Sequence, residues 1–203
     1  KANQAASDTF SITLSDGFAP NVNYDLVLNV TGANDAPLLS GTTTGLIREQ
    51  ADLSDSSKLL TASGSLKIDD PEGDTPITIT PGNSSLVFKG ADGTVLGNLS
   101  LSQQSQTTNT PQTQTDYWLQ QALAHIQFST QTTSPTTTST AVNGMTWSLS
   151  VEDKYLDFLK AGETLELTYP IQVSDSQGDH ADRDIVIKFL GANDAPHANQ
   201  DQV

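Results

Sequence analysis

Apolar and polar residues alternate in short stretches along most of the chain, which is the pattern of half-buried β-strands. Turn signals separate these stretches, among them Asp16-Gly17, Asp92-Gly93 and Asn143-Gly144. Many short strands with frequent turns predict an antiparallel β-sandwich. The predicted strands cover residues 9–15, 24–31, 64–68, 77–80, 86–89, 146–151, 164–173 and 183–190.

Two stretches break the alternation. Residues 102–116 and 129–143 are dominated by Ser, Thr, Gln and Asn, and we expect long polar loops or wide hairpin ends there. Between them, residues 116–126 carry apolar side chains at helical spacing, so we expect one short amphipathic helix packed on an end of the sandwich. Its apolar face would consist of Trp118, Leu119, Ala122, Leu123 and Ile126.

The chain repeats itself. The hexapeptide Gly-Ala-Asn-Asp-Ala-Pro occurs at residues 32–37 and again 159 positions later, at 191–196. The strands before each copy also match in register, so that Asp16 lies over Asp175. A repeat of this length indicates an array of similar modules, and such arrays usually serve as extenders or displays.

The repeat divides the chain into parts. We interpret residues 1–37 as the closing hairpin of a preceding repeat plus a linker, and residues 38–196 as one complete module with an insertion at about 100–145. Residues 197–203 would begin the linker to the next module. A hairpin without the rest of its module is marginally stable. We therefore expect residues 8–31 to pair with a sheet edge, of their own module or of a neighbouring molecule by strand exchange.

The charge balance excludes several partners. Nine Lys and Arg against 24 Asp and Glu give a net charge of -15, which excludes nucleic acid and anionic membranes as partners. No apolar run is long enough to insert into a membrane. The chain has no cysteine, so disulfides cannot stabilise it, and bound metal is the obvious substitute.

Catalytic signatures are missing. The chain has no Gly-x-Ser-x-Gly motif and no glycine-rich phosphate loop. His125 falls on the apolar helix face, which favours a packing role over that of a base. The three histidines have no His or Cys partner at zinc spacing. The sequence therefore predicts a protein that is not an enzyme.

Carboxylates gather at turns. Asp69, Asp70, Glu72 and Asp74 lie within six residues at the end of a predicted strand. Ca²⁺ takes about six to eight oxygen ligands, and such a cluster is costly unless a cation neutralises it. The alternative is a plain solvated turn.

Further acidic pairs come at other turns. Asp175 and Asp179 flank the turn before the last strand, although tight turns also use Asp for backbone reasons alone. Glu152 and Asp153, after the Trp147 strand, are another candidate pair. Because oxygen ligands predominate, Ca²⁺ is favoured over zinc.

The closing part of the module resembles a known family. It is similar to the closing half of VCBS and cadherin-like repeats of giant bacterial RTX adhesins. The similarity is carried by Trp147-Ser-Leu-Ser, by residues 159–175 and by the strand that ends in the second hexapeptide. The likeness covers residues 144–196 and 8–37, and more loosely 60–80. Residues 100–145 have no counterpart in the short form of that repeat. The resemblance implies an immunoglobulin- or cadherin-like β-sandwich in an extracellular, calcium-rigidified rod of the bacterial surface, exported by a type I system and serving adhesion and biofilm formation.

The resemblance also implies a set of linker ligands. In the cadherin pattern, linker residues share ions with a Glu near the start of a module and with acids at the same end. Asn34 and Asp35 are the linker positions here, and Glu49 and Asp69 fit the other two roles, although Arg48 could pair with Glu49 instead. Asn193 and Asp194 would act likewise at the far junction, with acids of the next module.

Two functions follow as hypotheses. In the first, the module is a spacer whose Ca²⁺ ions hold tandem domains rigid. In the second, the insertion at 100–145 binds a peptide or glycan through Tyr117 and Trp118, because binding sites concentrate in loops on rigid scaffolds. The alternative for these two aromatic residues is that they cap the open end of the sandwich.

Overall fold

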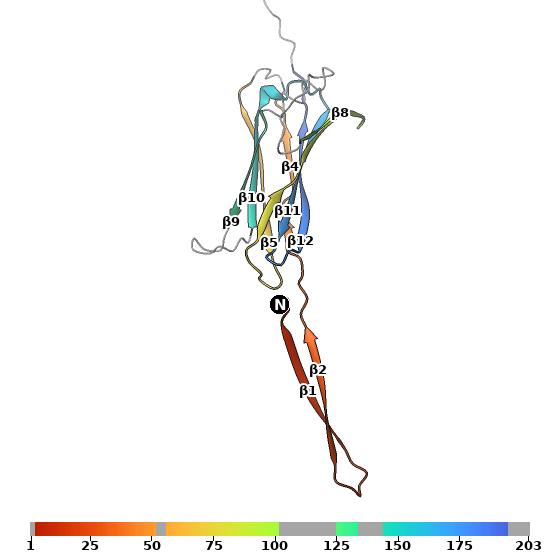
Figure 1. The fold of residues 1–203 in the computed structure, drawn as a ribbon. Coiled ribbons are helices and arrows are strands. Elements are labelled where there is room, and N and C mark those ends of the chain that lie inside the picture. The colour runs from red at the N-terminus through yellow and green to blue at the C-terminus, as the bar shows by residue number, and fades with distance from the viewer. Residues whose placement is uncertain (1–2, 52–55, 102–124, 134–143, 195–203) are drawn as a thin grey trace, which may run out of the picture.

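The computed structural model describes residues 3–51, 56–101, 125–133 and 144–194. These residues form an elongated sandwich of strands from which one hairpin projects (Figure 1). A short 3-10 helix, η1, covers Asp153–Tyr155. The strands are β1 Ala5–Leu14, β2 Val22–Thr31, β3 Leu38–Gly41, β4 Thr44–Arg48, β5 Leu59–Asp69, β6 Thr78–Pro81, β7 Ser84–Lys89, β8 Val95–Leu101, β9 Gln127–Thr133, β10 Gly144–Glu152, β11 Thr164–Ser174 and β12 His180–Leu190.

Two sheets face each other across the core. One has four strands in the order β3-β5-β10-β9, and the other has six, in the order β4-β12-β11-β7-β8, with β6 also pairing with β11. All pairings within the sandwich are antiparallel except that of β4 with β12, which is parallel. The predicted β-sandwich is confirmed, and the parallel pair is a feature that the sequence pattern did not indicate.

Alternation along the central strands builds the core. In β10, Met145, Trp147, Leu149 and Val151 are buried, while Thr146 and Ser148 between them are exposed. Strand β12 contributes further buried side chains at every second position, namely Ile185, Ile187 and Phe189. Because a slip of one residue would turn all of these side chains to solvent, the pattern fixes the register of both sheets.

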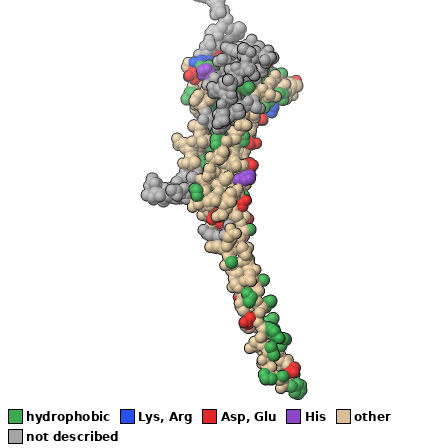
Figure 2. Space-filling view, in the orientation of Figure 1, with side chains coloured by type: hydrophobic (Ala, Val, Ile, Leu, Met, Phe, Trp, Pro, Cys, Tyr) green, Lys and Arg blue, Asp and Glu red, His purple; other side chains and the backbone are tan. Residues whose placement is uncertain are grey.

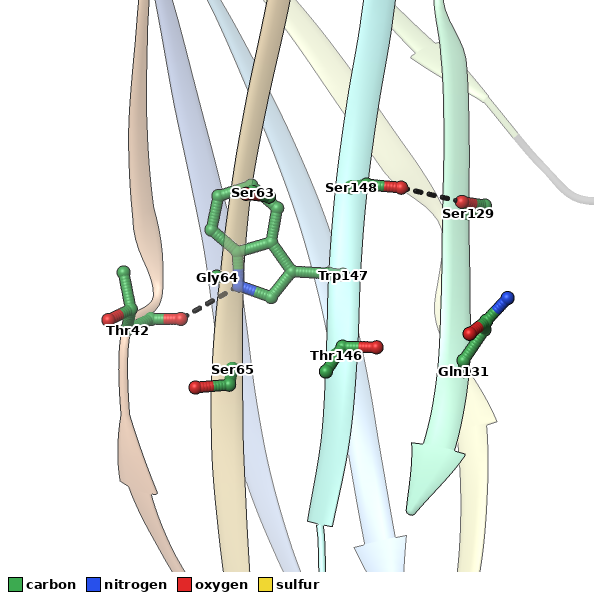
Figure 3. A pocket seen from close by; sticks show the side chains of 9 residues that line it. All are labelled: Thr42, Ser63, Gly64, Ser65, Ser129, Gln131, Thr146, Trp147 and Ser148. Carbon is green, nitrogen blue, oxygen red and sulfur yellow. Dashed lines mark hydrogen bonds between the residues drawn. The ribbon is translucent and has the colours of Figure 1, made fainter.

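Trp147 joins three strands. Its indole Nε1 donates a hydrogen bond to the carbonyl oxygen of Thr42, at 2.7 Å, in the connection between β3 and β4. The indole also lies against Gly64 of β5, where an added Cβ would come within 2.6 Å of the ring (Figure 3). The absence of a side chain at Gly64 thus makes the room that the indole occupies.

Each of the eight predicted strands is found, but four strands were not expected. These are β3, β4, β8 and β9. The expectation of a polar loop from residue 129 is wrong for residues 129–133, which belong to β9 and pair with β10. Six of the seven residues of β9 are Ser, Thr or Gln, the exception being Phe128. Among the described residues β9 is an edge strand, which needs little apolar surface. Of the expected helix, residues 116–124 lie outside the described residues. So do the expected polar loops, apart from residues 129–133.

The chain enters the sandwich at one end and leaves at the other. Residues 34–38 lie at the end formed by the close of β5 and the turn between β11 and β12. Glu49, η1 and the second hexapeptide, as far as Asp194, lie at the opposite end. The two copies of the hexapeptide therefore stand at opposite ends of one module.

The hairpin of β1 and β2 stands away from the sandwich (Figure 1). Its two strands pair with each other over their full length, from Ala5 opposite Thr31 to Leu14 opposite Val22. All of the residues in both strands are exposed. The predicted hairpin is present, and among the described residues it pairs with no other strand.

Candidate metal centre

Three carboxylates come together at the end of the module that the chain leaves. Glu49, Asp157 and Asp194 each offer an oxygen, and these oxygens lie within 4.8 Å of one another. Glu49 follows β4, and its N–H donates to the carbonyl oxygen of Leu190 at 3.0 Å. Because β4 runs parallel to β12, both strands deliver the residues that follow them to the same end of the sandwich.

The turn around η1 adds a fourth acid. Asp153 is fully buried, and its N–H donates to the carbonyl oxygen of Lys58 at 2.9 Å. One of its carboxylate oxygens, Oδ1, accepts the N–H of Gln50 at 3.0 Å. Gln50, two residues after β4, is thus hydrogen-bonded to the residue that follows β10.

Several carboxylate oxygens at this end are buried and have no donor. Glu49 is only 5% exposed, and its Oε2 accepts the N–H of Ala192 at 2.7 Å. Glu49 Oε1, Asp153 Oδ2 and Asp194 Oδ1 have no hydrogen-bond partner within the described part of the chain. A buried polar atom without a partner costs about 1–3 kcal/mol, and more when it is charged. Such oxygens suit a cation.

The electrostatics agree. The pKa of Glu49 is raised to about 8, chiefly by burial and also by the charges of Asp194, Asp157 and Asp153, against the hydrogen bond from the Ala192 N–H. Burial also raises the pKa of Asp153, against the N–H of Gln50. A divalent cation at this end would favour the charged forms of Glu49 and Asp153.

The opposite end is organised around Asn34. The Nδ2 atom of its side chain donates to Asp175 Oδ2 and to Asp179 Oδ2, each at 2.7 Å. Asp175 Oδ1 accepts three backbone N–H groups of its own turn, at 2.8 to 3.1 Å. Burial would raise the pKa of Asp175, but the bonds from Asn34 and from the turn outweigh it and lower the pKa. Asp175 therefore stays ionised at neutral pH.

The loop after β5 lies at this same end. Asp70 Oδ1 accepts the N–H groups of Glu72, at 3.0 Å, and Asp74, at 2.8 Å. Asp35 in the linker donates its N–H to Glu72 Oε2 at 3.3 Å. Asn34 Oδ1, Asp70 Oδ2 and Asp74 Oδ2 are buried without a partner among the described residues. The linker is thus hydrogen-bonded to the turn between β11 and β12 and to the loop after β5, and three buried oxygens remain without a partner among the described residues.

Two of the expected metal ligands, Glu49 and Asp69, do not have the surroundings that the sequence predicted. Glu49 does not lie near Asn34 and Asp35, as the resemblance implied, but at the other end, in one group with Asp194. The difference follows from the parallel pairing of β4 with β12, which carries Glu49 away from the first linker. Asp69 is exposed and forms an ion pair with the exposed Lys67 on the same strand.

Sequence reasoning missed Asp157. It stands four residues after Asp153, in a segment that was not assigned to any element, and η1 with its following turn brings it toward Glu49. The spacing of Asp153 and Asp157 after a strand was the one available signal. Asn193 is exposed, and its Nδ2 donates to the carbonyl oxygen of Asp194 at 3.3 Å.

The outer face of β5, β10 and β9 carries an open polar groove (Figure 3). Its lining includes exposed hydroxyl groups, and those of Ser129 and Ser148 lie 2.8 Å apart. None of the lining side chains is charged. Tyr117 and Trp118, the residues of the recognition hypothesis, lie outside the described residues, so that hypothesis stays a prediction. The groove is lined by Thr42, Ser63, Gly64, Ser65, Ser129, Gln131, Thr146, Trp147 and Ser148.

The chain was compared with known proteins. No protein-family profile and no curated protein matches the sequence. Among solved structures, it is similar to AggA, the major subunit of aggregative adherence fimbriae type I from Escherichia coli, at 9% identity over 78% of this chain and 97% of that chain, with a TM-score of 0.33. It is also similar to the zebrafish RET cadherin-like domains 1 to 4, at 10% identity over 95% of this chain and 34% of that one, with a TM-score of 0.30.

A further similarity is to CfaE, the adhesive subunit of the CFA/I fimbria of enterotoxigenic Escherichia coli. The identity is 9% over 96% of this chain and 59% of that chain, with a TM-score of 0.30. Similarities of this size carry no argument about activity. The described residues also contain no helix that is long and apolar enough to cross a membrane.

Proposed function

We propose that this chain is a calcium-stabilised extender module of a bacterial surface adhesin, whose ions hold tandem domains rigid. The observation that carries the proposal is the convergence of Glu49, Asp157 and Asp194 beside buried oxygens that lack donors. The extracellular bacterial location is an expectation that rests on the resemblance of the closing strands and the repeated hexapeptide.

The donor set fits calcium. Every candidate ligand is a carboxylate or amide oxygen, and hard oxygen ligands in a flexible number favour Ca²⁺ over zinc or copper. Glu49, Asp157 and Asp194 would hold the ion, with Asp153 close enough to add its charge. A bound divalent cation would add positive charge among these acids and favour the charged forms of Glu49 and Asp153.

The linker can serve two modules at once. Asp194 turns back to the module that it follows, where it meets Glu49 and Asp157. Asn34, in the first copy of the same hexapeptide, reaches forward to Asp175 and Asp179 of the module that it precedes. Asn193 and Asp35, which would have the opposite roles, are exposed. Each hexapeptide would therefore connect two neighbouring modules through one cluster of oxygens.

Such a junction suits a spacer. The hexapeptides stand at opposite ends of the sandwich, so that repetition places modules end to end (Figure 1). A flexible peptide between two modules would allow any angle, whereas ions that bind the linker and both modules restrict that angle. The result would be a stiff rod that carries an adhesive part away from the cell.

Thermal unfolding tests the proposal. With CaCl₂ at about 100 times the dissociation constant, each independent site adds about 2.7 kcal/mol, so we expect the melting temperature to rise by several degrees over that in EDTA. MgCl₂ should have a smaller effect, because Mg²⁺ sheds its water reluctantly. Asp157→Asn and Glu49→Gln should each remove much of the calcium shift.

The control is Asp184→Asn, which removes an exposed carboxylate from the middle of β12. We expect it to leave the calcium shift unchanged. Equal melting temperatures in CaCl₂ and EDTA would refute the proposal. A calcium shift that Asp157→Asn and Glu49→Gln leave intact would refute the assignment of the site.

A further inference from the structure

The projecting hairpin has an apolar face that no described residue of the chain covers. Eight large side chains point to one face of β1 and β2, and each is between 48% and 60% exposed. Figure 2 shows hydrophobic side chains gathered along the hairpin toward its tip. An exposed apolar patch of this kind marks an interaction site. The eight residues are Phe10, Ile12, Leu14, Val22, Tyr24, Leu26, Leu28 and Val30.

The opposite face of the same hairpin is mainly polar. Ser11 donates to Asp25 Oδ1 at 2.6 Å, and Thr13 donates to Asn23 Oδ1 at 2.8 Å, across the two strands. A hairpin with one polar and one apolar face is built to cover a hydrophobic core with one side and meet water with the other.

The hairpin has the same register as β11 and β12. Ala5 opposite Thr31 corresponds to Thr164 opposite Leu190, and Leu14 opposite Val22 corresponds to Val173 opposite Ala181. All ten pairs of the hairpin thus recur 159 positions later. The structure therefore extends the sequence repeat to the pairing of the strands.

The equivalent residues show what the apolar face is for. Ile185, Ile187 and Phe189 correspond to Leu26, Leu28 and Val30, and each is 0% exposed. In the module, the four-stranded sheet covers this face of β12 and β11. In addition, β4 pairs with the edge of β12 that faces away from β11, and β6 and β7 pair with the edge of β11 that faces away from β12. Within the described parts of the chain, the hairpin has none of these neighbours.

We propose that the apolar face of the hairpin is covered by strands that precede β1 in the same natural chain and that form a sandwich with β1 and β2 as its last two strands. The covering segment would supply a parallel strand beside β2, as β4 does for β12, and an antiparallel strand beside β1, as β7 does for β11. Its other sheet would lie over Phe10, Leu26 and Leu28. This interface is independent of any metal.

A second copy of this chain fits the face less well. The position that the hairpin would take in another copy's sandwich is already occupied by β11 and β12, which belong to that sandwich's core. Asp8 is the one acid on the apolar face, at the position of the buried Leu167. The covering strands must therefore leave the Asp8 carboxylate to water or give it a donor.

The test lengthens the chain at its N-terminus by one repeat of its natural sequence, about 160 residues. Hydrogen exchange would be followed at the backbone N–H groups of β1 and β2 in this chain and in the 203-residue chain. An isolated hairpin is marginally stable, so its N–H groups exchange quickly. In the longer chain we expect slowing by at least about 1,000-fold, the lower end of the folding equilibrium constants of small domains.

Two variants locate the interface. Leu26→Asp, on the apolar face, should abolish the protection in the longer chain, whereas Val27→Asp, on the opposite face, should preserve it. Both should leave the sandwich of residues 38–194 intact, because the hairpin pairs with none of its strands. Equal exchange of the hairpin in the two chains would overturn the proposal. So would sedimentation that shows the longer chain as a dimer which Leu26→Asp dissociates, because the occupant would then be a second copy.

Discussion

At the level of single residues, Glu49 is placed where a carboxylate is costly. It is nearly fully buried, one of its oxygens has no donor, and three other acids lie close enough to raise its pKa. A core position would ordinarily carry an apolar residue. The presence of an acid there has a physical reason if a cation neutralises it, and without the cation it destabilises the fold.

Because Glu49 is buried, the stability of the folded chain should depend on pH. The pKa of Glu49 is about 8 in the folded chain, against an ordinary value of 4.5. Between these values the folded state holds a proton that the unfolded state releases, so the stability of the metal-free protein should fall as the pH rises from about 4.5 to about 8. We expect a loss of a few kcal/mol in urea unfolding of metal-free protein.

Glu49→Gln should flatten that dependence, because it removes the titrating group. A residual slope of the same sign should remain from Asp153, whose pKa is also raised. Asp184→Asn, exposed on β12, should keep the full slope. Parallel curves for Glu49→Gln and the natural sequence would contradict this account of the site.

At the level of elements, the indole of Trp147 contacts β5 and the connection between β3 and β4, and so links both to β10. Trp147 of β10 fills the space over Gly64 of β5 and bonds to Thr42 between β3 and β4. Gly64→Ala would place a Cβ 2.6 Å from the ring of a side chain that is almost fully buried. We expect a loss of about 1–3 kcal/mol in urea unfolding, the usual cost of overpacking a core.

The adjacent exposed residue supplies the control. Ser63→Ala changes a side chain of the same strand that points away from the core, so its stability should stay within about 0.5 kcal/mol of the natural chain. A Gly64→Ala chain as stable as Ser63→Ala would mean that the indole is free to move aside.

The sequence was informative where alternation was strong. The buried residues of β10, β11 and β12 recur at every second position, and these strands were predicted close to their observed bounds. Strands β3 and β4 are short and contain Ser, Thr and Gly, and β9 is a polar edge strand, so their pairing partners rather than their own composition define them. The parallel pairing of β4 with β12 is a long-range contact that no local pattern shows.

The same limit explains the site. Acidic residues and the repeated hexapeptide were visible in the sequence, and they pointed to oxygen ligands at the module ends. The direction of β4 determines at which end of the sandwich Glu49 lies. The path of the chain after η1 determines that Asp157 lies near Glu49. Local composition therefore identified the chemistry, and tertiary pairing decided which residues meet.

At the level of the whole molecule, an acidic cluster lies at each end of the sandwich. The first linker is held by Asp175, Asp179 and Glu72, and the second lies beside Glu49 and Asp157. With a net charge of -15, the metal-free chain carries acidic groups that repel one another, and cations bound to it would reduce that repulsion.

The most direct test of the central claim is an anomalous difference map from crystals grown in saturating CaCl₂. We expect a calcium peak about 2.3–2.6 Å from oxygens of Glu49, Asp157 and Asp194. A map with no peak among these three carboxylates would contradict the proposed calcium site.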